Sequence, residues 1–372
     1  MKVIIIIPTY NEKANIANTI DGLETAFKKI PAKHQMNILV IDDNSPDGTA
    51  DIVKKKAKQY GNIILFPNKE KKGLGAAYIK AMKYAITKLK ADVVFEYDAD
   101  GSHQPKYIPG MVKTLETKAD VVVGSRYIPG GSMPDDWGIH RKLVSYVGNL
   151  IARVVLFTPQ FKDMTTGFRG TKTKFLKKVD LDNLISKQFA YKIQLYYELH
   201  RLGAKVVEYP IAFIDRSKGK SKFPRNNIID SLRVVFKLRL RDSQQFIKFG
   251  IVGFIGFIVN AVALEAFYRL GLKAREAAAL GAELAIISNF TFNNIWTFAH
   301  KKITSWKRLP KKFIQFNFAS IGAVLIQYIV VGLGVYFFGD GVRFIFFVVA
   351  VAIGLLVNYT IYTRWIWKTH KK

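Results

Sequence analysis

Apolar and polar positions divide the chain into two parts of different character. In the first part, residues 1 to about 215, short apolar runs alternate with longer stretches of helical periodicity. The apolar runs are 3–7, 38–41, 62–66, 93–97 and 121–123, and the helical stretches between them include 16–29, 50–60 and 74–88. Runs that are apolar on both faces and are joined by helices are typical of a parallel sheet covered by helices. The pattern therefore predicts an α/β domain, in which ligands bind at the carboxyl ends of the strands.

The second part, residues 246–372, has the apolar character of a membrane protein. Four long apolar stretches follow one another at about 246–270, 274–298, 313–338 and 342–365. A helix needs about 20 apolar residues to cross a bilayer. The pattern therefore predicts an all-α transmembrane domain of four helices.

This membrane part contains an internal repeat. Phe246-Ile247-Lys248-Phe249 resembles Phe313-Ile314-Gln315-Phe316, and Asn289-Phe290-Thr291-Phe292 resembles Asn358-Tyr359-Thr360-Ile361. Each hairpin of helices begins with Phe-Ile and ends in a group of aromatic residues, which is typical of a membrane interface. The repeat indicates two duplicated helical hairpins.

Basic residues are distributed unevenly around the predicted spans. They gather in the loop 299–312 and in the last residues, 368–372, whereas the loops on the other side carry few of them. Positively charged loops stay on the cytoplasmic side. We therefore expect a multi-pass membrane protein whose α/β domain and C-terminus face the cytoplasm. The first apolar run is too short for a signal peptide, which agrees with that placement.

The overall charge points to a polyanionic partner. Lys and Arg total 57 against 28 Asp and Glu, so the formal net charge is +29. Nucleic acid, an anionic membrane surface and phosphate-bearing substrates all attract such a charge. The apolar second part favours the lipid bilayer and phosphates, and we expect no nucleic-acid partner. The chain has no cysteine, which excludes disulfides and cysteine-based metal sites.

Two further segments, 139–157 and 226–244, combine basic and apolar side chains. Basic amphipathic helices beside membrane spans usually lie in the plane of the lipid headgroups. An ordinary surface helix that packs on the sheet is the alternative for each segment. The predicted organisation is a cytosolic domain over 1–222, an amphipathic linker over 223–245 and a membrane domain over 246–372.

The most informative polar residues follow the apolar runs. Asp98 and Asp100 come directly after the run 93–97, on one side of the chain. Two carboxylates with this spacing suit Mg²⁺ or Mn²⁺, although acidic pairs are also common in solvated turns. The segment from Asp42 to Thr49 also ends a run, and it can bind a base or ribose, form an Asx turn, or do both. An acceptor phosphate requires cations; the candidates are Arg126, Arg141, Arg216, Lys218, Lys220 and Lys222.

Seven motifs occur in order over residues 1 to about 225. They are Ile7-Pro8-Thr9-Tyr10-Asn11-Glu12, Ile41-Asp42-Asp43-Asn44-Ser45-Pro46-Asp47-Gly48-Thr49, Gly73-Leu74-Gly75, Asp98-Ala99-Asp100-Gly101-Ser102-His103-Gln104-Pro105, Gly124-Ser125-Arg126-Tyr127, Thr165-Thr166-Gly167-Phe168-Arg169 and Arg216-Ser217-Lys218-Gly219-Lys220-Ser221-Lys222. Together they resemble family 2 glycosyltransferases of the GT-A fold, and most closely the dolichol-phosphate mannose synthases. The membrane part resembles the GtrA-type four-helix domain.

This resemblance implies a role for each matched residue. The guanosine pocket would be formed by Pro8, Tyr10, Glu12 and Asp43. The metal and the donor diphosphate would be surrounded by Asp98, Asp100 and Ser102. Some family members carry Gln at the position of Ser102, and the shorter serine would reach the metal through a water molecule. The lipid phosphate would be held by Arg126 and Arg141 with Ser145 nearby, and the basic loop from Arg216 to Lys222 would close over the donor.

The activity implied by the resemblance is inverting transfer of mannose from GDP-mannose to dolichyl phosphate, with Asp100, Arg126 and Arg141 as the catalytic residues. An anionic phosphate needs no general base, and His103 is interpreted as structural. The alternatives are a polyprenyl-phosphate glucosyltransferase that uses UDP-glucose, and a translocator of lipid-linked sugars whose soluble domain is regulatory. The predicted roles of the membrane domain are to anchor the enzyme, to hold the lipid acceptor, or to form a homo-oligomer.

Overall fold

The computed structural model describes residues 1–215 and 226–368. The chain forms two compact units, Met1–Arg239 and Leu240–Lys372. The predicted basic loop that includes Arg216, Lys218, Lys220 and Lys222 lies outside the described residues.

The first unit is built on a seven-stranded sheet, and its strand order is β3-β2-β1-β4-β6-β5-β7. The strands are β1 Lys2–Thr9, β2 Gln35–Asp42, β3 Ile63–Pro67, β4 Val93–Glu96, β5 Val121–Ser125, β6 Arg169–Lys172 and β7 Val206–Pro210. The first five contain or overlap the five predicted runs. The sheet is mixed rather than parallel throughout, because β6 runs antiparallel to both β4 and β5.

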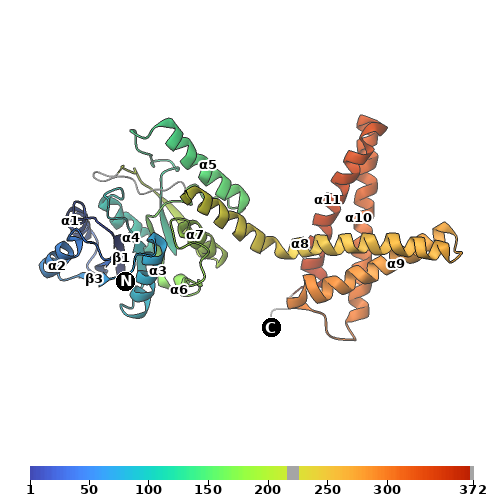
Figure 1. Ribbon diagram of the computed structural model, residues 1–372, viewed down its shortest axis with the longest axis horizontal. Helices are drawn as coiled ribbons and strands as arrows, with labels where there is room; N and C mark the ends of the chain where they lie inside the picture. The colour runs from blue at the N-terminus through green and yellow to red at the C-terminus, as the bar shows by residue number, and fades with distance from the viewer. Residues whose placement is uncertain (216–225, 369–372) are drawn as a thin grey trace. The chain divides into compact units, whose positions relative to one another are not determined.

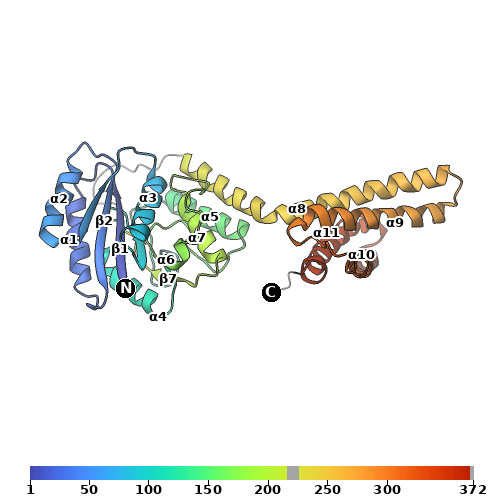
Figure 2. The same ribbon diagram turned by 90° about the horizontal axis from the view of Figure 1, so that it is seen from below.

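Alternation along β1 explains why the sheet is covered on both faces. Val3, Ile5 and Ile7 belong to one hydrophobic core, while Ile4 and Ile6 belong to the other, and all five are fully buried. Successive side chains of a strand point to opposite faces, so a run that is apolar throughout requires helices on both sides. Figure 2 shows α1 and α2 on one face of the sheet and α3 on the other.

The helices of this unit divide between those two cores. The face with Val3 is covered by α1 (Ile16–Phe27), α2 (Thr49–Tyr60) and α4 (Ile108–Thr117), which follows the short turn η1 (Pro105–Tyr107). The other face is covered by α3 (Leu74–Thr87), α5 (Ile139–Val155), α6 (Thr173–Leu176), α7 (Tyr191–Arg201) and the beginning of α8 (Asn226–Arg269). The prediction of an α/β architecture is confirmed.

The two segments predicted to be interfacial differ in how they pack. On α5 the apolar side chains of Ile139, Leu143 and Val154 are largely exposed, so they do not pack on the sheet and remain available to a membrane surface. The segment 226–244 is the first part of α8, and Val234 and Leu238 are buried in the core of the first unit. One face of that segment therefore packs as an ordinary surface helix does.

The second unit is helical (Figure 1). Its helices are the later part of α8, α9 (Ala274–Phe292), α10 (Leu309–Phe338) and α11 (Arg343–Ile361); the short turns are η2 (Asn293–Thr297), η3 (Ala299–Lys301), η4 (Asp340–Val342) and η5 (Tyr362–Ile366). Three stretches of the described chain, α8, α10 and Asp340–Ile366, are long and apolar enough to cross a membrane. The helix α9 is not among them, so the fourth span stays a prediction.

Aromatic side chains hold the second unit together. The ring of Trp367 stacks on that of Phe298 with centroids 4.4 Å apart, and its Nε1 donates to Oδ1 of Asn294 at 3.1 Å. Both rings are fully buried, and Phe316 and Tyr362 pack in the same cluster. Because α8 continues without a break from 226 to 269, the predicted boundary at 245 falls inside a helix.

Candidate active site

A cavity of about 320 Å³ lies at the carboxyl ends of the central strands in the first unit. It is lined by Pro8, Thr9, Tyr10, Glu12, Asp43, Lys71, Gly73, Leu74, Ala77, Asp98, Ala99, Asp100, Gln188, Phe189 and Asn227. The pairing of β1 with both β2 and β4 brings the ends of these strands together. Six of the predicted donor-side residues therefore line one cavity: Pro8, Tyr10, Glu12, Asp43, Asp98 and Asp100.

Asp42 and Asp43, which are neighbours at the end of β2, have different roles. The carboxylate of Asp42 accepts hydrogen bonds from Thr9 Oγ1 at 2.8 Å and from Ser45 Oγ at 2.6 Å. Asp47 holds the turn in the same way, by accepting from Thr49 Oγ1 at 2.6 Å. Asp42 and Asp47 thus stabilise the turn, and Asp43 is the acidic residue of this motif that faces the cavity.

Asp43 is held in a buried hydrogen-bond chain. Asn68 Nδ2 donates to its Oδ1 at 2.7 Å, and Lys80 Nζ donates to Asn68 Oδ1 at 2.6 Å. Burial raises the pKa of Asp43, although the hydrogen bond from Asn68 opposes this. At the same end of the cavity, Lys71 Nζ lies 3.4 Å from the centroid of the Tyr10 ring, an attractive cation–π contact.

Asp98 is surrounded by partners that fix its charge. Tyr78 donates to its Oδ1 at 2.8 Å, and Lys192 Nζ lies 3.5 Å from its Oδ2. Burial alone would raise the pKa of Asp98, but Lys192, His103 and Tyr78 together lower it to about 2. The side chain is therefore ionised at neutral pH, before any substrate binds.

His103 supports this loop from beneath. Its Nδ1 pairs with the backbone N–H of Asp98 at 3.1 Å, and its ring stacks on Phe168 with centroids 4.9 Å apart. The side chain is 2% exposed, and burial lowers its pKa. A buried imidazole that accepts from the backbone supports a structural role for His103.

Ser102 does not lie where a metal ligand is expected. Its side chain is buried and lines no part of the cavity, and its backbone N–H donates to Asp100 Oδ1 at 3.1 Å. Ser102 thus orients Asp100. In the described part of the chain, no group of three or more His, Asp or Glu side chains is placed to hold a metal ion. A pair of carboxylates suits an ion that takes its other ligands from substrate phosphates and water.

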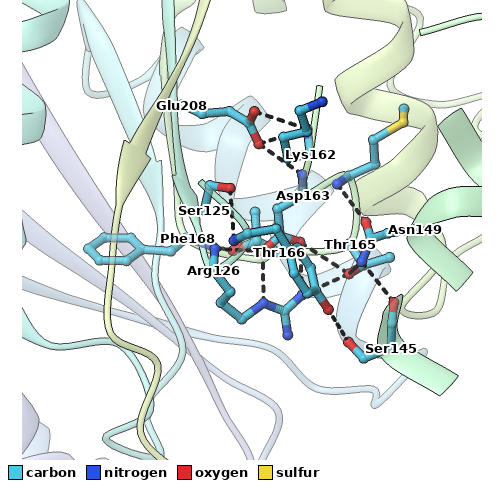
Figure 3. Close-up of polar contacts among 12 residues, drawn as sticks. Ser125, Arg126, Ser145, Asn149, Lys162, Asp163, Thr165, Thr166, Phe168 and Glu208 are labelled. Atoms are coloured by element: carbon cyan, nitrogen blue, oxygen red, sulfur yellow. Dashed lines mark hydrogen bonds and ion pairs between the residues drawn. The ribbon is translucent and has the colours of Figure 1, made fainter. Parts of the chain in front are cut away.

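Arg126 lies in a buried cluster of polar side chains (Figure 3). Its Nε and Nη2 donate to the two carboxylate oxygens of Asp163 at 2.7 and 2.8 Å, and Nη2 also donates to Thr165. Burial would lower the pKa of Arg126, but fully buried Asp163 raises it. The remaining nitrogen, Nη1, has no hydrogen-bond partner among the described residues, and it can donate to an anion.

Two further acceptor-side residues lie near this cluster. Ser145 Oγ lies 2.7 Å from the hydroxyl oxygen of Tyr127, next in sequence to Arg126. Arg141 is paired with Asp215 at 2.8 Å and lies over the ring of Trp137, 3.8 Å from its centroid.

An aromatic bridge connects the two arginines. Phe213 lies under Arg126, with the guanidinium carbon 5.5 Å from its ring centroid, and its ring packs against Trp137 at 5.8 Å. Phe213 also packs against His103, with centroids 6.0 Å apart. The two arginines and the loop of Asp98 therefore share one connected structure.

Sequence reasoning missed several residues of this site. Lys192, Tyr78 and Gln188 come from α7, α3 and the segment before α7, and none has a recognisable motif around it. Only the glycines give a signal: a Cβ atom at Gly75 would lie 2.7 Å from the carbonyl oxygen of Gln188. Because the backbone passes this close, position 75 admits no side chain.

Comparison with known proteins finds a family match in each of two parts of the chain. Residues 4–180 match the family model "Glycosyl transferase family 2", and residues 248–367 match "GtrA/DPMS, transmembrane domain". The dolichol-phosphate mannosyltransferase of Pyrococcus furiosus is 31% identical over 333 residues, which cover 89% of this chain and 90% of the relative. The undecaprenyl-phosphate mannosyltransferase of Micrococcus luteus is 38% identical over 222 residues, which cover 60% of this chain and 87% of the relative.

Solved structures are less similar. Mannosyl-3-phosphoglycerate synthase from Rubrobacter xylanophilus is 18% identical with a TM-score of 0.48, and the match covers 66% of this chain and 75% of that one. The resemblance to family 2 glycosyltransferases and to the GtrA-type domain is confirmed by the family models and the relatives. The chain belongs to the membrane-bound branch of glycosyltransferase family 2 that includes the dolichol-phosphate mannosyltransferase of Pyrococcus furiosus, and it is a transferase.

Proposed function

We propose that the chain transfers mannose from GDP-mannose to a polyprenyl phosphate such as dolichyl phosphate, with release of GDP. Relatives named as mannosyltransferases of dolichol phosphate and undecaprenyl phosphate support mannose as the sugar and a polyprenyl phosphate as the acceptor. GDP-mannose as the donor follows from the resemblance to the dolichol-phosphate mannose synthases. The observation that carries the proposal is that Asp98 and Asp100 line the same cavity as Asp43 and Tyr10. A nucleotide diphosphate sugar needs both groups of residues, one for the nucleoside and one for the diphosphate.

On the donor side, Asp43 and Tyr10 would bind the nucleoside. Asp43 can accept hydrogen bonds from a base or a ribose, and burial in its chain with Asn68 fixes its direction. Lys71 and Gln188 line the same cavity and can donate to phosphate oxygens.

A divalent cation, Mg²⁺ or Mn²⁺, fits the carboxylate pair of Asp98 and Asp100. When bound, such an ion offsets the negative charge that develops on the leaving diphosphate. Lys192 already balances the charge of Asp98. We therefore expect Asp100 to be the principal protein ligand and Asp98 to orient the site. The assignment of Ser102 to the metal loses support, because its side chain is buried away from the cavity.

On the acceptor side, Arg126 and Arg141 would position the lipid phosphate. A phosphate monoester is an anion at neutral pH, so its oxygen attacks without a general base. That oxygen forms a bond to the anomeric carbon while the bond from this carbon to the diphosphate breaks, and GDP leaves with the bonding electrons. A single displacement inverts the configuration, which gives a β-linked mannosyl phosphate. Arginines at fixed positions lower the entropic cost of this alignment.

The protein is a membrane protein, since it has three long apolar helices and a GtrA/DPMS transmembrane domain. We place the catalytic unit on the cytoplasmic side, because the loop 299–312 is basic. The exposed apolar face of α5, which includes Ile139 and Leu143, suits the headgroup region of that leaflet. Self-association through the membrane domain stays a prediction, which the mass of the solubilised particle tests.

The proposal is tested with the purified full chain in detergent. The protein is incubated with dolichyl phosphate, Mg²⁺ or Mn²⁺, and either GDP-mannose or UDP-glucose, and the lipid product is identified by mass spectrometry. We expect dolichyl mannosyl phosphate when GDP-mannose is the donor and no glycosylated lipid when UDP-glucose is the donor. The product should be lost when EDTA removes the divalent ion.

Two variants test whether transfer depends on the carboxylates of the cavity rather than on any carboxylate of the surface. Asp100→Ala should reduce the rate at least about a thousandfold, a loss typical of an essential electrostatic group. Asp51→Asn is the matched control, because Asp51 is an exposed carboxylate on α2 that lines no part of the cavity. A glucosyl product, or an Asp100→Ala rate equal to that of the control, would overturn the proposal.

A further inference from the structure

The second unit contains a cavity of its own, of about 230 Å³, between its helices. Ten residues line it, and they form five pairs that occupy equivalent positions of the two repeated hairpins. The pairs are Phe249 and Phe316, Gly253 and Ser320, Ile286 and Leu355, Asn289 and Asn358, and Asn293 and Tyr362. Both copies of the repeat therefore contribute the same positions to one cavity.

The helical geometry follows the same repeat. The chain leaves α9 through the π-helical turn η2, Asn293–Thr297, and leaves α11 through η5, Tyr362–Ile366. These two turns are equivalent in the repeat, and each begins at a residue that lines the cavity. Single π-helical turns occur frequently at functional sites.

Three amide oxygens of this lining have no hydrogen-bond partner among the described residues. They are Oδ1 of Asn289, Asn293 and Asn358, all of them buried atoms, and Asn293 is only 2% exposed. Buried polar groups in proteins nearly always have partners. Polar residues within membrane-spanning segments, where each unpaired group is costly, indicate a functional site.

The chemistry of the lining selects a neutral ligand. No charged side chain of the described residues lines the cavity, so neither an anionic phosphate nor a divalent ion finds a counter-charge there. Amides and the hydroxyls of Ser320 and Tyr362 donate and accept, as the hydroxyls of a sugar do. The apolar rings of Phe249 and Phe316 offer a surface for the C–H face of a pyranose.

The size and place of the cavity narrow the ligand further. Its volume lies just below the roughly 300 Å³ at which pockets for drug-sized ligands begin, which suits one sugar ring. The lining residues come from α8, from the first half of α10, and from the ends of α9 and α11 with the turns that follow them; those of α9, η2 and α10 are close in sequence to the basic loop 299–312. We place that end of the helices at the headgroups of the cytoplasmic leaflet, because the loop beside it is basic, so a sugar carried by a lipid can enter there.

We propose that the membrane unit binds the neutral hexosyl group of a glycosylated lipid between its two hairpins, through Asn289, Asn293 and Asn358. Mannose as the hexose rests on the proposed function, since the product of that reaction is a mannosyl lipid. The site is separate from the cavity of Asp98 and Asp100 and needs none of its residues.

The test uses octyl β-D-mannoside as the probe and the full chain in a polyoxyethylene detergent, because maltoside detergents carry a sugar themselves. Binding is followed by tryptophan fluorescence. Among the five tryptophans, Trp367 is the one expected to respond, because its ring centroid lies 6.0 Å from that of Tyr362 and 6.1 Å from that of Phe316. We expect saturable binding of octyl mannoside, and no such saturation with octanol or octyl phosphate.

Leucine variants distinguish a binding role from a structural one. Asn293→Leu and Asn358→Leu should each weaken binding at least tenfold. Their melting temperatures without ligand should equal or exceed that of the parent, because leucine removes an unpaired buried amide. The control is Asn317→Leu, since the amide of Asn317 donates to the Phe313 carbonyl of its own helix and does not line the cavity. Its affinity should be unchanged.

Each contrary outcome identifies what failed. Equal binding by the Asn293 and Asn358 variants, or saturation by octyl phosphate, would overturn the inference. A melting temperature that falls in both variants while affinity is retained would show that the asparagines only support the fold. Asp100→Ala removes transfer but should leave octyl mannoside binding intact, so the failure of either proposal is seen without the other.

Discussion

Lys192 is the residue whose replacement tests the active-site electrostatics most directly. It is 1% exposed, and its Nζ lies 3.5 Å from the carboxylate of Asp98. Lys192→Met removes the charge and keeps most of the volume. In the variant the pKa of Asp98 should rise, because burial, which raises it, is then opposed only by His103 and Tyr78.

The size of the effect follows from the pKa of Asp98. A fall from the ordinary value of 3.8 to about 2 is roughly two units, or about 2.5 kcal/mol at 1.36 kcal/mol per unit. Three partners share this, and a quarter of the Asp98 side chain is exposed to screening solvent, so we assign about 1–2 kcal/mol to Lys192. At about 1.4 kcal/mol per factor of ten, the transfer rate should fall roughly tenfold.

The pH dependence has a definite sign. The folded-state pKa of Asp98 is depressed, so its ionised form stabilises the parent protein above pH 3.8, and that contribution is lost as the pH falls through about 2. In Lys192→Met the loss begins at a higher pH. Melting temperatures between pH 2 and 5 measure this shift, and initial rates of mannosyl transfer at neutral pH measure the loss of activity.

Lys172→Met is the matched control, because Lys172 Nζ lies at the same 3.5 Å from Asp120 but neither residue lines the cavity. The control should transfer mannose at the parental rate. If Lys192→Met also retains the parental rate at neutral pH within a factor of two while remaining folded, Lys192 does not hold Asp98 in its active state.

Three further predictions concern neighbouring residues. Arg126→Lys breaks the two-point pairing with Asp163 and should lower kcat/KM for the polyprenyl phosphate about a hundredfold, with a melting temperature lower by several degrees; an acceptor titration and a thermal melt measure this. Gly167→Ala places a Cβ against Lys192 Nζ, so its rate should fall about as far as that of Lys192→Met. Burial raises the pKa of Asp43, so the KM for GDP-mannose should rise as the pH falls toward 5, and Asp43→Asn should remove that dependence; donor titrations at several pH values decide it.

The sequence predicts the parts of the fold that depend on local patterns. The run 3–7 is apolar at every position, and β1 is buried on both faces as a central strand must be. The strand β6 could not be found in this way. Its sequence, Arg169 to Lys172, is short and polar, and it is buried because Arg169 pairs with Glu96 at 2.6 Å in the core. In the sequence, the two charged residues of a buried ion pair cannot be distinguished from surface residues; only the structure shows that they pair.

The same limit applies to the candidate site. Asp98 and Asp100 can be recognised in the sequence because they follow a predicted strand, and both residues line the cavity. Lys192 and Asp163 cannot be recognised in this way, because the residue that pairs with a charged side chain can come from any element that the topology brings near. The side chain of Ser102 was expected to face the metal, yet it is buried, since the turn at Gly101, with φ of 80°, directs the backbone N–H of Ser102 toward Asp100.

Three cations of the site are paired with carboxylates before any substrate arrives, although the chain as a whole carries +29. Arg126 is paired with Asp163, Arg141 with Asp215, and Lys192 with Asp98. Recognition of a lipid phosphate therefore depends on the fixed direction of N–H groups more than on net charge, and the ion pairs supply that direction. An acceptor held in this way is positioned without being bound tightly, so the product can leave once its phosphate has become a diester with one negative charge fewer. The remaining positive charge of the chain lies largely outside these pairs, where it suits the anionic surface of the membrane.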